Sequence, residues 1–290
     1  MQKLDFQPKF FSCIKNYNKN TFMSDLMAGV IVGIVALPLA IAFAIASGVS
    51  PEKGIVTAII AGFIVSFLGG SKVQIGGPTG AFIVIVYGVI QQYGLAGLTV
   101  ATMIAGVLLI LIGVFKLGTV IKFIPYPVVI GFTSGIAVTI FTTQMADVFG
   151  LNFGGETVPG DFIGKWMLYF RHLDTINWWD AGVCVISVLI IALTPQVSRR
   201  IPGSLVAIIF VTVGVWVMKT YFGITGIDTI GDRFSIDSHL PKAVIPALDW
   251  EAIKNLFPIA VTIAALGAIE SLLSATVADG MISDHHNSNT

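Results

Sequence analysis

Long stretches without a single charged residue dominate this sequence, and several are as long as a helix that crosses a bilayer. They cover residues 26–51, 54–71, 73–115, 123–146, 181–198 and 201–218, and residues 255–278 contain Glu270 as their sole charge. About 20 apolar residues in an α-helix span the hydrocarbon core of a membrane. With 55% hydrophobic and 11% charged residues, the chain lacks the polar surface that a soluble globule of this size needs. We therefore predict an all-α integral membrane protein in contact with the lipid bilayer.

The stretch 73–115 is too long for one crossing, and we divide it at residues 91–94 (QQYG). The part that follows the division has ordinary length. The part before it can be helical only from about Pro78 to Gln92, because the residue pair Gly76 and Gly77 precedes the proline. Such a helix is about 22 Å long, which is too short to span. The sequence thus predicts about eight membrane segments, one of which is a half-helix.

Several function classes are not indicated by the composition. The formal net charge of +0 and the lack of a basic cluster argue against a nucleic-acid partner. Cys13 and Cys184 are too few and too distant for a disulfide framework or a cysteine metal site. We find no nucleophile with a base and no metal triad, so we expect no enzyme, no catalytic residue and no resident metal.

The distribution of Lys and Arg predicts the orientation in the membrane. With a cytoplasmic N-terminus, nine of the 16 basic residues lie inside, and most of the remainder lie in two long outer loops, which count less. Residues 1–24 contain four lysines and no continuous apolar run, so we interpret them as a cytoplasmic segment and not a signal peptide. The expected location is the cell membrane, with multiple crossings.

The first feature with chemical potential is the run 74–82 (QIGGPTGAF). Glycines allow close approach of backbone to a ligand, and proline suits the first position of a helix. A helix that begins at membrane depth leaves its first N–H groups unpaired, and its dipole places partial positive charge there. An anion would satisfy both, with Thr79 adding a hydroxyl donor. A kink packed against neighbouring helices is the structural alternative, and spacing alone does not choose between the two.

The second feature is Glu270, the carboxylate within an apolar segment. Placing it there costs on the order of 3 kcal/mol unless it is protonated, paired or bound to a cation. Ser274 follows one helical turn later on the same face, so the two side chains are placed to share Na⁺ or a proton-linked hydrogen bond. A neutral structural glutamate, or one that reaches to the interface, is the alternative.

Three groups of residues, in this order along the chain, resemble the SulP family of sulfate permeases and anion transporters. The first comprises residues 25–29 (DLMAG) with 36–38 (ALP) and the alternating small residues of 42–48; the second is 76–80 (GGPTG); the third comprises 267–274 (GAIESLLS) with 278–281 (ADGM). Each is weak alone, but together they extend over the whole chain. Leu39 departs from the pattern, because many members carry glutamine there.

The resemblance implies a secondary transporter with two inverted repeats of seven helices each. This chain would hold the first repeat plus one helix. The anion would bind between two half-helices, with backbone N–H groups of Thr79, Gly80, Ala81 and Phe82 at the first of them. Glu270 matches an acidic position that binds Na⁺ or takes part in proton coupling, and Ser274 matches a hydroxyl ligand of sodium-coupled members.

The resemblance also implies that family members continue beyond residues 285–290 (HHNSNT), through six further helices and a soluble STAS domain. We therefore expect residues 25–283 to form a truncated transporter domain and 284–290, with Asp284, His285 and His286, a polar inner loop. We accordingly expect this chain to contain no STAS domain.

The expected function is secondary active transport of a small inorganic or carboxylate anion such as sulfate or bicarbonate, as a symport with H⁺ or Na⁺. No other cofactor is implied, and a homodimer is one candidate assembly of the full-length protein. The alternatives are a nucleobase transporter of the same fold and a non-transporting scaffold or remnant.

Overall fold

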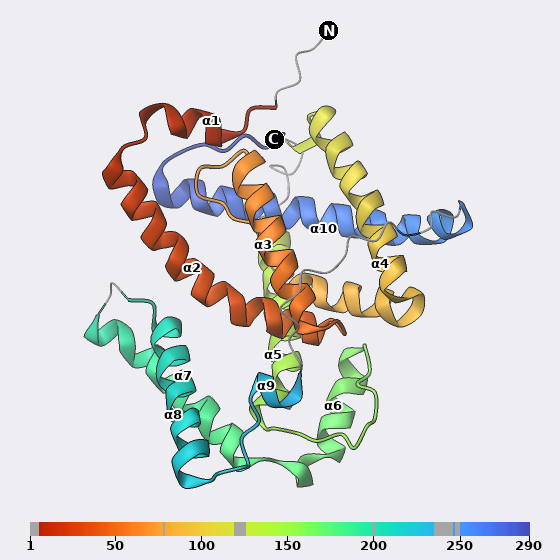
Figure 1. Ribbon diagram of the computed structural model, residues 1–290. Coiled ribbons are helices and arrows are strands. Elements are labelled where there is room, and N and C mark those ends of the chain that lie inside the picture. The colour runs from red at the N-terminus through yellow and green to blue at the C-terminus, as the bar shows by residue number, and fades with distance from the viewer. Residues whose placement is uncertain (1–5, 78, 119–125, 199–200, 235–245, 247–249) are drawn as a thin grey trace. The chain divides into compact units, whose positions relative to one another are not determined.

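The computed structural model describes residues 6–77, 79–118, 126–198, 201–234, 246 and 250–290, and the part of the chain that it describes contains helices and no strand (Figure 1). The α-helices are α1 (Lys9–Cys13), α2 (Lys19–Ala46), α3 (Pro51–Leu68), α4 (Ile83–Val114), α5 (Tyr126–Val148), α6 (Phe162–Arg171), α7 (Trp178–Val197), α8 (Gly203–Phe222), α9 (Ile230–Arg233) and α10 (Trp250–Ile282). Short 3₁₀ helices are η1 (Ile14–Asn16), η2 (Gly80–Phe82) and η4 (Leu173–Thr175). Each of the eight expected membrane segments overlaps one of these described helices, which confirms the predicted fold class.

Local sequence explains where these helices begin. The Asn18 side chain accepts a hydrogen bond from the Thr21 amide at 2.8 Å and so caps the start of α2. Pro51 occupies the first turn of α3, where its missing N–H costs nothing. Six described helices have both the length and the apolar composition for a membrane crossing.

Helix α4 is two helices joined at a kink, as the sequence predicts. Gly94 has φ 66° and ψ −175°, a backbone conformation that only glycine adopts readily. The segment from Ile83 to this kink is the predicted half-helix, and the segment that follows has the length of an ordinary crossing. The predicted start at Pro78 lies outside the described residues; helical structure begins at η2.

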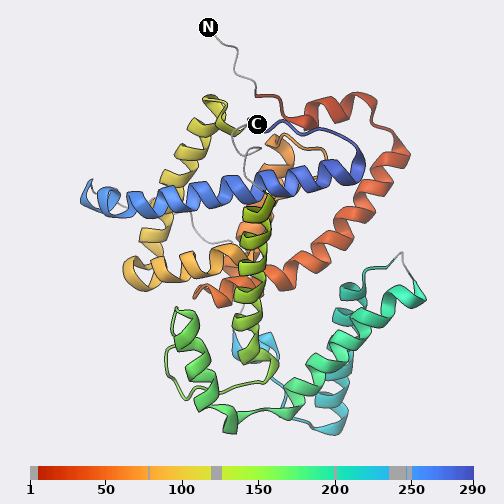
Figure 2. The same ribbon diagram turned by 180° about the vertical axis from the view of Figure 1, so that it is seen from behind.

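The chain divides into two compact units, of which the first comprises residues 1–26, 40–134 and 238–290. Its core lies between the second half of α4 and the first half of α10, which cross in both views (Figures 1 and 2). Small side chains let the two backbones approach closely, and Ala101 and Ala260 are completely buried. The larger core members are Val100, Leu256 and Ile263.

The second unit comprises residues 27–39 and 135–237. Within it α7 and α8 lie side by side as a helical hairpin (Figure 2). Asn177 caps α7 by accepting from the Trp179 amide at 3.0 Å, and its own amide group donates to the Gly226 carbonyl. Tyr169 of α6 is buried and stacks on Phe153, with 5.8 Å between ring centroids.

Candidate functional site

The sequence-predicted residues Thr79 and Glu270 are 191 positions apart and meet in the first unit. The Thr79 hydroxyl donates to Glu270 Oε1 at 2.5 Å. Both side chains are half-buried, so the contact lies on the inner side of α10 and is not a free surface pair.

Thr79 also closes the turn that begins the half-helix. Its hydroxyl accepts from the Ala81 amide at 3.3 Å, and its carbonyl accepts from the Phe82 amide at 3.4 Å. Both distances lie at or beyond the long end of the range for N–H···O bonds, so these contacts are weak. The amides proposed to face an anion are thus held in a local turn by bonds that a stronger acceptor can replace.

Phe82 and Gly267 explain why η2 lies against α10 at this level. Phe82 packs on the core formed by α4 and α10. A Cβ added to Gly267 would be 3.7 Å from the Phe82 ring, an ordinary contact distance, so Gly267 of α10 faces this ring. The apolar packing of Phe82 therefore fixes the position of Thr79, three residues earlier.

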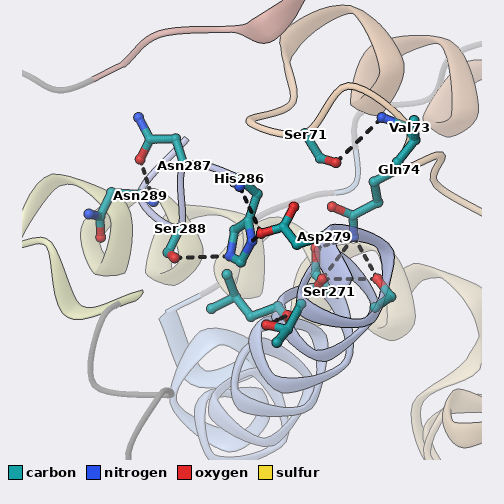
Figure 3. A network of polar contacts seen from close by, with 12 residues as sticks. Ser71, Val73, Gln74, Ser271, Asp279, His286, Asn287, Ser288 and Asn289 are labelled. Atoms are coloured by element: carbon teal, nitrogen blue, oxygen red, sulfur yellow. Dashed lines mark hydrogen bonds and ion pairs between the residues drawn. The ribbon is translucent and has the colours of Figure 1, made fainter. Parts of the chain in front are cut away.

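Gln74 is the main residue of the site to which the sequence-based prediction assigned no role. Its Nε2 donates to the Ser271 carbonyl at 2.8 Å, with the Ser271 hydroxyl at 3.1 Å (Figure 3). It also donates to the Ser274 hydroxyl at 2.7 Å. The Ser274 hydroxyl in turn donates to the Ser271 carbonyl at 2.9 Å. The available signal was an amide side chain two residues before Gly76 in a charge-free stretch.

Together the site contains one carboxylate, three hydroxyl groups and one amide, contributed by residues 74–79 and by α10. Oxygen ligands of this kind suit a hard monovalent cation, and a carboxylate in an apolar segment is also a natural proton acceptor. Among the residues that the structure describes, no three His, Cys, Asp or Glu side chains group into a metal site.

The fold and this site identify the class of protein. It is a multi-pass α-helical membrane protein with a broken helix, and the beginning of that helix contacts an acidic residue on another helix. Residues 22–290 match the model of the sulfate permease family. The chain belongs to that family.

Relatives and a solved structure agree with this assignment. The chain is 45% identical over 282 residues to "Putative sulfate transporter YvdB" of Bacillus subtilis, covering 97% of this chain and 52% of that protein. It is 32% identical over 245 residues to the bicarbonate transporter BicA of Synechocystis, covering 81% and 42%. The solved transmembrane domain of a cyanobacterial BicA superposes with a TM-score of 0.75 at 30% identity, covering 94% of this chain and 69% of that one. The chain spans about half the length of these two curated relatives.

Proposed function

We propose that the full-length protein containing this chain is a secondary active transporter of a small anion, such as sulfate or bicarbonate, in the cell membrane. Family membership and the names of the similar proteins support an anion as the substrate. The hydrogen bond between Thr79 and Glu270 carries the coupling part of the proposal, because it connects the start of the half-helix to the acidic residue.

The proposed coupling follows from the chemistry of Glu270. A bound Na⁺ or a proton neutralises the carboxylate, which lowers the cost of keeping it in an apolar segment. The state of Glu270 is transmitted to Thr79, whose hydroxyl donates to the carboxylate and accepts from the Ala81 amide. We place the anion beside residues 79–82 and the cation beside Glu270 and Ser274, so that each binds better when the other is present.

The test is uptake of labelled sulfate or bicarbonate by proteoliposomes that contain the full-length protein, with and without an inward Na⁺ or H⁺ gradient. We expect Glu270→Gln to abolish gradient-driven uptake while expression is retained. Glu251→Gln is a matched control, because Glu251 is an exposed glutamate at the start of the same helix.

Three results would overturn parts of this proposal. Unchanged cation dependence in Glu270→Gln would remove the coupling role of the carboxylate. Uptake of labelled uracil in place of the anions would assign the other transporter class. Binding of a protein partner with no flux of any of these solutes would favour a scaffold.

A further inference from the structure

Residues 284–290, here called the return segment, run back from the end of α10 toward the ends of α3 and α4. The reversal occurs at Ser283, a non-glycine residue with φ 54°. The amide of Asn287 then donates to the Gly70 carbonyl at 2.9 Å, just after α3 ends. The segment is therefore packed against other parts of the first unit and is not a free polar loop.

Glycines make room for this path. A Cβ on Gly70 would overlap the Asn287 carbonyl oxygen, and a Cβ on Gly118 would overlap the Ser288 carbonyl oxygen. A Cβ on Gly113 would lie 3.2 Å from the Asn289 carbonyl oxygen, which is tighter than most side-chain contacts. Three separate positions thus lack a side chain where the return segment passes, which is the role of glycine at close backbone approaches.

His286 attaches the return segment to α10. Its side chain is 8% exposed, and its Nδ1 lies 2.7 Å from Asp279 Oδ2. The same carboxylate oxygen accepts from the His286 backbone amide at 2.9 Å. Because a carboxylate only accepts, Nδ1 carries the proton, and in the neutral ring Nε2 accepts from the Ser288 hydroxyl at 3.0 Å (Figure 3).

The ion pair between Lys72 and Asp284 is the weaker attachment. The two groups are 2.8 Å apart, and the hydrogen bond that the Lys72 ammonium donates to Asp284 raises the pKa of Lys72 above its usual range. The Lys72 side chain is 44% exposed, however, and exposed pairs of this kind contribute little to stability. The buried imidazole is therefore the stronger of the two links.

These contacts connect His286 to the candidate site through the loop 69–79. Through Asn287 it holds Gly70, at the start of the loop 69–79. The same loop carries Gln74, bonded to Ser271 and Ser274 of α10, and ends at Thr79, bonded to Glu270. The loop is thus attached to α10 directly at its middle and end. At its beginning it is attached through the return segment, which His286 holds against α10.

We propose that His286 is a positioning residue that, through Asp279 and Asn287, holds loop 69–79 in register with α10 and so sets the contact between Thr79 and Glu270. The proposal rests on the proposed function for its transport consequence. The positional claim itself does not depend on transport.

The transport test compares substitutions of His286 in the full-length protein by the cation dependence of uptake. We expect His286→Ala to raise the cation concentration for half-maximal uptake about tenfold, as for loss of one buried hydrogen bond, with a smaller change in kcat. His286→Asn retains a donor at the Nδ1 position and should restore much of the affinity. His285→Ala is the matched control, because this neighbouring histidine is exposed and should tolerate the change.

The second test is hydrogen–deuterium exchange of the peptide that covers residues 69–77. We expect faster exchange in His286→Ala, an intermediate rate in Ser288→Ala, which removes only the Nε2 partner, and no change in His285→Ala. If His286→Ala does not fold, the exchange rates of Ser288→Ala and His286→Asn are compared with the parent protein instead, and both should be faster than the parent rate.

Unchanged exchange in His286→Ala would overturn the positional claim, whatever the uptake data show. Faster exchange with unchanged cation dependence would overturn the effect on the site. Faster exchange in a protein that moves no anion would support the attachment and count against the proposed function alone.

Discussion

At the scale of single residues, Thr79 connects the two halves of the site. A hydroxyl has one proton and two lone pairs, so Thr79 can donate to Glu270 and accept from the Ala81 amide at the same time. The sequence predicted a donor for an anion at this position. The structure shows that the hydroxyl proton is directed to the carboxylate of Glu270.

Thr79→Val tests this connection, because valine has nearly the same shape and neither donates nor accepts. We expect the apparent affinity for the coupling cation to fall about ten- to hundredfold, the range for losing a hydrogen bond to a charged group. Thr79→Ser retains the hydroxyl and should stay near the parent protein. The measurement is uptake as a function of Na⁺ concentration and of pH, and equal curves for Val and Ser would contradict the connection.

At the scale of elements, the break in α4 creates the half-helix and lets its beginning reach α10. Without the conformation of Gly94, residues 83–114 would form one straight helix. A Cβ at Gly94 would meet no atom within 4 Å, so the reason for glycine there is its backbone conformation and not crowding. Prolines within α2, α7 and α10 are accommodated without such a break.

Gly94→Ala should therefore destabilise the protein by about 1–3 kcal/mol, the cost of forcing a non-glycine residue into this conformation. Gly106→Ala is the matched control in the same helix, where a Cβ also meets nothing within 4 Å and φ is not positive. The alanine there should be neutral or stabilising by up to about 1 kcal/mol. Thermal unfolding in detergent compares the two, and equal midpoints would argue against a strained kink.

At the scale of the whole molecule, the helices expose large apolar side chains to their surroundings. Phe63 is 70% exposed and Ile110 is 67% exposed. Such surfaces are normal for a multi-pass membrane protein and would cause aggregation in water. The excess of Lys and Arg at the expected inner ends favours a cytoplasmic N-terminus.

The two cysteines allow a direct test of that orientation. Cys13 lies in α1, before the first crossing, and Cys184 lies within α7. In a Cys184→Ser background, we expect a charged, impermeant maleimide to label Cys13 in inside-out vesicles and not in intact cells. Cys13→Ser in the same background should remove the signal, and labelling in intact cells would reverse the assigned orientation.

The sequence by itself determined the helical membrane fold and the division of 73–115, and it singled out Thr79 and Glu270 as candidate site residues. Each of these follows from local properties: the length of an apolar run, the breaking of a helix by glycine, or the cost of a carboxylate in an apolar segment. Such properties can be read from neighbouring residues without knowing how the helices pack.

Only the tertiary structure decided which of these residues meet. The bond from Thr79 to Glu270, the contacts of Gln74 and the attachment of His286 to Asp279 depend on how residues 69–79 and the return segment pack against α10. The same holds for the crossing of α4 and α10, which rests on buried alanines such as Ala101 and Ala260. In the sequence these alanines look like those on any other apolar helix, because side-chain size permits close approach but does not specify the partner.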